Sequence, residues 1–123
     1  MSESIIKPNE LLHRAIEPNK GFWLDKEGRI SSSLFKDSNG VSVDINADRT
    51  DDEVKEAFLH VFSALEGEAR LSVQLCLDNN CNVQTDPSER NPYHTLILGK
   101  NKAGLTSGQA KQLAKNCQFI RYD

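Results

Sequence analysis

The sequence predicts an α+β fold: a single domain, residues 1–123, with a largely antiparallel or mixed sheet of about five strands and two helices covering one face. A length of 123 residues is that of one domain. Short stretches of alternating apolar residues, bounded by turn residues, recur along the chain and are typical of strands. Two capping boxes precede segments with helical apolar spacing. Strands joined by short turns and mixed with two helices indicate an α+β arrangement.

The first third of the chain contains two predicted strands. Residues 11–16 are rich in apolar side chains and lie between two Pro-Asn turns, which predicts a strand. Residues 30–35 fit either a strand or a single helical turn, because their three serines suit both. Residues 37–40, with the sequence Asp-Ser-Asn-Gly, are a strong turn signal. The apolar residues of 41–45 then alternate as in a half-buried strand.

A helix is predicted next. Thr50 and Glu53 form the first capping box, in which each side chain bonds the backbone N–H of the other residue. The apolar residues that follow recur at helical spacing and are Val54, Ala57, Phe58, Val61, Phe62 and Leu65. This stripe predicts a helix with one buried face that ends at Gly67.

The second half of the chain contains further short strands and a second helix. Residues 71–75 alternate, which predicts a strand, and residues 83–85 and 95–98 predict two more. The second capping box begins at Thr106, and the small apolar residues after it predict a short helix. Residues 119–122 can form a closing strand.

The composition is that of a soluble globular protein, with 37% hydrophobic and 27% charged residues. This balance excludes collagen, coiled-coil and disordered chains. No apolar stretch is long enough to span a membrane. The amino terminus lacks the features of a signal peptide, and three cysteines are too few for a disulfide scaffold. We therefore expect a cytoplasmic protein with free thiols.

Charge is spread unevenly along the chain. Residues 48–68 carry seven acidic and two basic side chains, whereas residues 99–123 carry five basic and one acidic. The asymmetry fits either two solvated helix faces or a surface for a protein partner, through the acidic helix 51–65 or the basic region 99–123. A net charge of −3 argues against nucleic-acid binding.

Familiar catalytic and cofactor motifs are absent. The sequence has no phosphate-binding loop, dinucleotide fingerprint, zinc-protease motif or nucleophile elbow, so we predict no cofactor. Cys76, Cys81 and His94 have the residue types of a zinc site. However, the spacing of the two cysteines is loose and no second ligand pair follows, so no metal site is predicted.

Arg14 and His94 are the candidate catalytic residues. His94 follows an Asn-Pro turn, where Asp86 can orient it as a general base; the alternative is a histidine that caps the turn. Arg14 can bind a phosphate or a carboxylate. It alternates with His13, so the two point to opposite faces of a strand unless that strand twists or bulges. The alternative role for Arg14 is a structural ion pair with a carboxylate such as Asp44.

Several short motifs have a familiar order: R-A-I, S-S-x-x-F, S-V-D, D-P and N-P-x-H. In this order the chain resembles a group of small bacterial proteins over most of its length. The resemblance implies no particular activity. It points to Phe35 as a position to examine and suggests Ser32, Ser42 and Asp86 as binding residues beside the two candidate catalytic ones.

The chain is also similar to the ADP-ribosyltransferase superfamily, whose members carry an Arg or His on an early strand and then a strand bearing Ser or Tyr. Arg14 and the serines of residues 31–33 match these two features. Members of that superfamily often also carry a glutamate late in the chain, and this feature has no counterpart here. The only glutamate after Glu68 is Glu89, which lies in a predicted turn.

Two function classes follow from these observations. The first is a non-catalytic protein-interaction or regulatory module, favoured by the absence of a complete catalytic motif. The alternative is an enzyme or nucleotide-binding protein with a polar pocket around Arg14, Ser32 and His94, for which the resemblance to ADP-ribosyltransferases suggests one activity.

Overall fold

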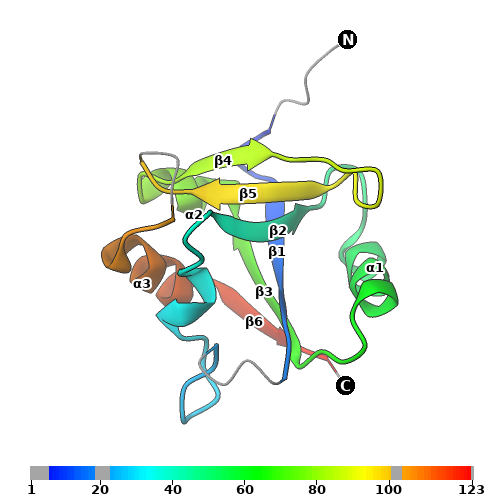
Figure 1. Cartoon of the computed structure of the whole chain (residues 1–123), viewed down its shortest axis with the longest axis horizontal. Helices are drawn as coiled ribbons and strands as arrows, with labels where there is room; N and C mark the ends of the chain where they lie inside the picture. Colours follow the sequence, from blue (N-terminus) through cyan, green and yellow to red (C-terminus); the bar gives the residue numbers. More distant parts are fainter. Residues whose placement is uncertain (1–5, 19–22, 101–103, 123) are drawn as a thin grey trace.

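A six-stranded antiparallel sheet forms the centre of the molecule (Figure 1). The structure is a computed structural model that describes residues 6–18, 23–100 and 104–122. The strands are β1 (Leu11–Ile16), β2 (Val41–Ile45), β3 (Gly67–Ser72), β4 (Asn82–Thr85), β5 (His94–Leu98) and β6 (Gln118–Arg121). They lie in the order β4-β5-β2-β1-β3-β6, and every described pair is antiparallel. The predicted α+β class is confirmed, with six strands where about five were expected.

Helices lie on both faces of the sheet, where the sequence predicted two helices on one face. The helices are α1 (Asp51–Val61), the 3-10 helix η1 (Ser32–Phe35), α2 (Val73–Asp78) and α3 (Ser107–Asn116). In Figure 1, η1 and α3 lie on one side of the sheet and α1 stands on the other. Both predicted capping boxes are present at the start of α1 and of α3.

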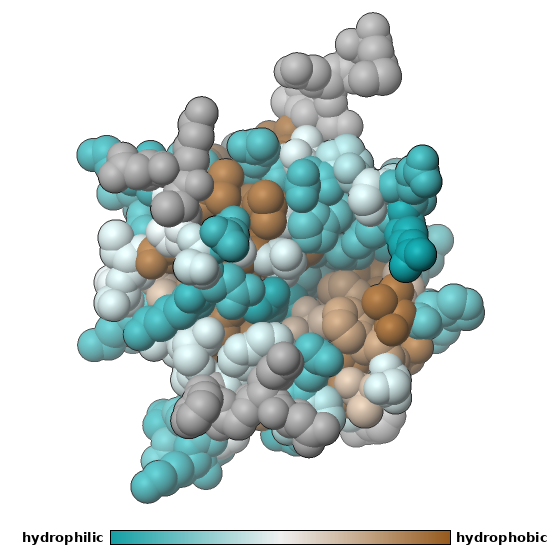
Figure 2. All heavy atoms as spheres, in the orientation of Figure 1, coloured by the Kyte–Doolittle hydropathy of each residue, from teal (hydrophilic) through white to brown (hydrophobic). Residues whose placement is uncertain are grey.

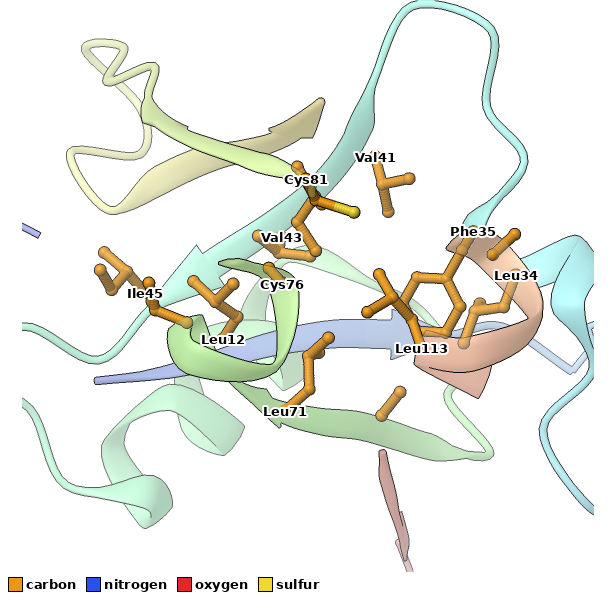
Figure 3. Packing of buried hydrophobic residues seen from close by; sticks show 14 of the residues in the cluster. Leu12, Leu34, Phe35, Val41, Val43, Ile45, Leu71, Cys76, Cys81 and Leu113 are labelled. Atoms are coloured by element: carbon orange, nitrogen blue, oxygen red, sulfur yellow. The ribbon is translucent and has the colours of Figure 1, made fainter. Parts of the chain in front are cut away.

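The main core fills the space between the sheet and the helices η1, α2 and α3. Figure 3 shows Leu12 and Val43 of the sheet in the same layer as Phe35 of η1, Cys76 of α2 and Leu113 of α3. All five side chains are buried. This face of the sheet is apolar because alternate residues of each strand point to it.

The segment 71–75 is not the strand that its alternating residues predicted. β3 starts earlier, at Gly67, and ends at Ser72, whose hydroxyl accepts a bond from the backbone N–H of Leu75 and caps α2. A Cβ on Gly67 would lie 2.1 Å from the carbonyl oxygen of Ile120, so the close approach of β6 requires glycine there. Gly67 is therefore a strand residue and does not end the preceding helix. Val73 and Cys76 are buried three residues apart, as on a helix face.

Helix α1 is shorter and less buried than the sequence predicted. It ends at Val61, and Phe62 already has an extended backbone. Only Val54 and Phe58 of its apolar stripe are buried, whereas Val61 is 76% exposed. The ambiguous segment 30–35 contains the 3-10 helix η1, so the helical alternative holds for most of it.

Candidate functional site

The site begins where β1 and β2 separate. These two strands pair at two positions, Leu12 with Ile45 and His13 with Asp44, whereas β1 pairs with β3 at six. Beyond His13 the edge of β2 that faces β1 pairs with no strand among the residues that the structure describes. Its backbone groups need other hydrogen-bond partners, because unpaired buried backbone groups are costly.

Arg14 fills this gap between the strands. Its Nη1 donates to the carbonyl oxygen of Ser42 (2.9 Å), and its Nη2 donates to the carboxylate of Asp37 (3.0 Å). The guanidinium carbon lies 4.9 Å from the centre of the Trp23 ring. Burial lowers the pKa of Arg14, although the Asp37 carboxylate favours its charged form. The sequence correctly anticipated an ion pair for Arg14 as one alternative, but its suggestion of Asp44 was wrong.

A cavity of about 360 Å³ opens beside this gap, between α1 and the sheet face opposite the main core. Its sheet residues include His13 on β1, Ser42 and Asp44 on β2, and His94 on β5. Asp44 lies opposite both His13 and His94 in the strand registers, so all three side chains point to one face. Arg14 also lines the cavity. His13 and Arg14 therefore contribute to one site, because the pairing of β1 with β2 ends at His13 and the strands separate from Arg14 onward.

Aromatic and aliphatic side chains make up much of the wall. Helix α1 and the residue after it supply Ala57, Phe58, Val61 and Phe62. The two phenylalanine rings form an edge-to-face pair with centroids 6.1 Å apart. Figure 2 shows hydrophobic side chains gathered over α1, at the right of the view. Trp23 and Tyr93 add two more rings to the lining.

Arg49 links the loop before β5 to the end of β2 through its side-chain contacts. Its guanidinium carbon lies 3.5 Å from the centre of the Tyr93 ring, and its Nη2 donates to the carbonyl oxygen of Ile45 (2.9 Å) and to Asp44 (3.3 Å). Asn91 donates to the other oxygen of Asp44 (2.9 Å). The Asp44 carboxylate is thus satisfied by two donors and joins β2 to the loop.

His94 is oriented by Asp86, the residue that follows β4. Its Nδ1 lies 3.1 Å from both the backbone oxygen and a carboxylate oxygen of Asp86. With Nδ1 donating to Asp86, the other nitrogen, Nε2, is free to accept or donate a proton. The side chain is about a quarter exposed. This geometry suits either an acid–base group or a histidine that fastens the 86–94 turn.

A buried ionic cluster lies next to the cavity and was not predicted from the sequence. Nδ1 of His13 lies 2.9 Å from the carboxylate of Glu68, and both side chains are fully buried. Arg70 donates to the second oxygen of Glu68 and to Asp51 at the start of α1. Nε2 of His13 contacts the side-chain oxygen of Asn46. The cluster therefore ties α1 to β1 and β3.

The charge state of Glu68 follows from these contacts. Burial opposes ionisation, but the hydrogen bonds and charges of His13 and Arg70 outweigh it and lower the pKa of Glu68. Register alone could have indicated this cluster, because β3 pairs Arg70 with His13 on one face. This register was not predicted, because the strand was expected at residues 71–75.

The predicted site residues do not all come together. Arg14, Ser42 and His94 line the cavity, and Asp86 contacts His94 from outside the lining. Ser32 lies in η1 and is not a lining residue. Arg49, Arg90 and Tyr93 are among the lining residues to which the sequence assigned no role, and Asn91 entered only as part of the N-P-x-H motif.

Comparisons with protein-family models, curated proteins and solved structures found no match to this chain. Within the described ranges, no group of three or more His, Cys, Asp or Glu side chains could hold a metal ion, and no helix could cross a membrane. Cys76 and Cys81 are buried in the main core, whereas His94 lines the cavity on the other face.

Proposed function

We propose that the protein binds a small molecule with a flat, largely apolar body in the cavity between α1 and the sheet. The main support for this proposal is the cavity itself, which has a volume of about 360 Å³ and four aromatic residues in its lining. Ligand cavities commonly have volumes of about 300–1,000 Å³ and combine apolar walls with a few polar groups. This proposal develops the ligand-binding alternative from the sequence, with Ser42 in place of Ser32.

One wall of the cavity is aromatic and the other, on the sheet side, carries polar groups. Phe58, Phe62 and Tyr93 present rings that can pack against a planar molecule, which favours an aromatic ligand. Ser42 and His94 supply polar atoms on the sheet side, which can fix its orientation. Binding in such a site uses apolar burial for affinity and polar groups for specificity.

The test is calorimetric titration with 2-naphthol, a neutral two-ring probe. Ala57→Trp places an indole in the cavity from α1 and should abolish binding. Leu59→Trp is the matched control, since Leu59 lies on the same helix but does not line the cavity and is already 45% exposed. We expect saturable binding to the wild type and to the control. Absence of binding to the wild type, or equal binding to both variants, would contradict the proposal.

A second candidate is the protein-interaction or regulatory module. Its support is the exposed apolar surface at the last turn of α1, where Leu59 and Val61 are 45% and 76% exposed, on a helix whose first turn is acidic. An apolar patch flanked by charge is typical of interaction surfaces. Affinity capture at low salt should retain a partner on the wild type and lose it on Leu59→Lys. Equal recovery from both would remove this candidate.

A further inference from the structure

We infer that the ligand of the α1 cavity carries an anionic group, a carboxylate or a phosphate, bound between Arg90, His94 and Ser42. This inference rests on the proposed function and specifies the chemical class of its ligand. It comes from the distribution of charge and of uncommitted hydrogen-bond donors around the cavity.

Most charged groups in the lining are already neutralised within the protein. Arg49 pairs with Asp44, and Arg14 pairs with Asp37. Arg90 is exposed and lines the cavity, yet it has no acidic partner among the residues that the structure describes. An arginine guanidinium can bind a carboxylate or phosphate through two parallel hydrogen bonds.

The loop that carries Arg90 is well anchored. The backbone N–H of Ser88 donates to the carbonyl oxygen of Asn91 (3.0 Å), and that of Asn91 donates back to Ser88 (3.2 Å). The side chain of Asn91 accepts from the backbone N–H of Tyr93 (3.0 Å) and donates to Asp44. A fixed loop lowers the entropy cost of using Arg90 for binding.

Ser42 and His94 add two hydrogen-bonding groups on the sheet side. In the strand register, Asp44 lies opposite His94, so Ser42 is a diagonal neighbour of His94 on the same face. The Ser42 hydroxyl has no hydrogen bond to another described side chain or backbone group, and Nδ1 of His94 is occupied by Asp86 while Nε2 is not. The Ser42 hydroxyl can therefore donate to the same anion as the guanidinium, and Nε2 of His94 can do so when the ring is protonated, because Nδ1 then keeps its bond to Asp86.

Glu17 determines which end of the cavity an anion can occupy. It lines the cavity just beyond the end of β1, near Arg14, whose charged form it favours. Its carboxylate repels an anion from that end. The anionic group therefore lies toward Arg90 and His94, and the planar body lies toward Phe58 and Phe62.

The experiment compares neutral and anionic probes of matched shape. Calorimetric titrations use 2-naphthol against 2-naphthoate, and adenosine against adenosine 5′-monophosphate. We expect the anion of at least one pair to bind about 10-fold more tightly, the size of one charge-assisted hydrogen bond. The pair with the larger ratio identifies the anion as carboxylate or phosphate. Arg90→Gln should remove most of this preference and leave the neutral probe unaffected.

Lys115→Gln is the matched control, because it makes the same charge change on α3, which packs against the opposite face of the sheet. It should keep the preference. Equal affinity for neutral and anionic probes in both pairs would overturn this inference while leaving the proposed function intact. A preference unchanged by Arg90→Gln would also overturn it. Failure of every probe to bind would contradict the proposed function instead.

Discussion

The buried carboxylate of Glu68 gives the sharpest stability prediction. Glu68→Gln keeps the size of the side chain but removes its charge, leaving His13 and Arg70 without their shared anion. The carboxylate now accepts bonds from Nδ1 of His13 (2.9 Å) and from Nε (3.0 Å) and Nη2 (2.5 Å) of Arg70. Breaking a buried ion pair by removing one partner costs about 3–5 kcal/mol. Asp51 still faces Arg70 in the variant, so we expect about 3 kcal/mol.

Urea unfolding measures this change as a shift in midpoint at constant slope. Glu66→Gln is the matched control two residues away, because Glu66 pairs with Arg121 in a largely exposed bridge. Exposed pairs contribute about 0–1 kcal/mol. If Glu68→Gln lost less than about 1 kcal/mol, or no more than the control, the cluster would not fasten α1 to the sheet as argued.

The same carboxylate predicts a pH dependence. The folded protein lowers the pKa of Glu68, so its ionised form stabilises the fold above about pH 4.3, the ordinary value for glutamate. That contribution is lost as the pH falls through the lower folded pKa. The difference in unfolding free energy between wild type and Glu68→Gln should therefore shrink in acid. A constant difference from pH 7 to pH 3 would show that charge is not its cause.

Two further predictions concern the backbone and the thiols. Gly67→Ala places a Cβ 2.1 Å from a carbonyl oxygen of β6 and should lower the free energy of unfolding in urea by about 2 kcal/mol. Gly108→Ala is the control, because its Cβ would meet only the Thr106 hydroxyl at 3.9 Å, and it should cost less than about 0.5 kcal/mol. Equal effects of the two substitutions would contradict the close approach of β6 to Gly67. Burial raises the pKa of Cys76 to about 12 and that of Cys81 to about 11, so iodoacetamide at pH 8 should label neither in the native protein and both in urea, as read by mass spectrometry. Labelling of either thiol in the native protein would show that it is not buried.

Local signals in the sequence predicted much of the fold. The Thr50 and Thr106 capping boxes mark both long helices, because a cap is a property of four consecutive residues. The strand predicted at residues 71–75 was wrong because the same apolar residues fit a strand or a short helix. Their state is decided by Ser72, which caps α2, and by β6, which pairs with the start of β3.

The candidate site was predictable only in part. Arg14, Ser42 and His94 were singled out as polar residues on or beside strands, and all three line the cavity. The contact between His13 and Glu68 joins residues 55 positions apart, so it depends on strand order that no local pattern contains. Likewise, the stacking of Arg49 on Tyr93 requires β2 and β5 to be neighbours.

Protein-observed NMR with 2-naphthoate can show whether a ligand occupies the cavity between α1 and the sheet. We expect saturable shift changes in the amides of α1, of β2 near Ser42 and of residues 90–94, which together enclose the cavity. Ala57→Trp should abolish these changes and Leu59→Trp should retain them. Saturable changes confined to α3 and η1 on the opposite face, or no saturable change at all, would contradict the assignment of this cavity as the ligand site.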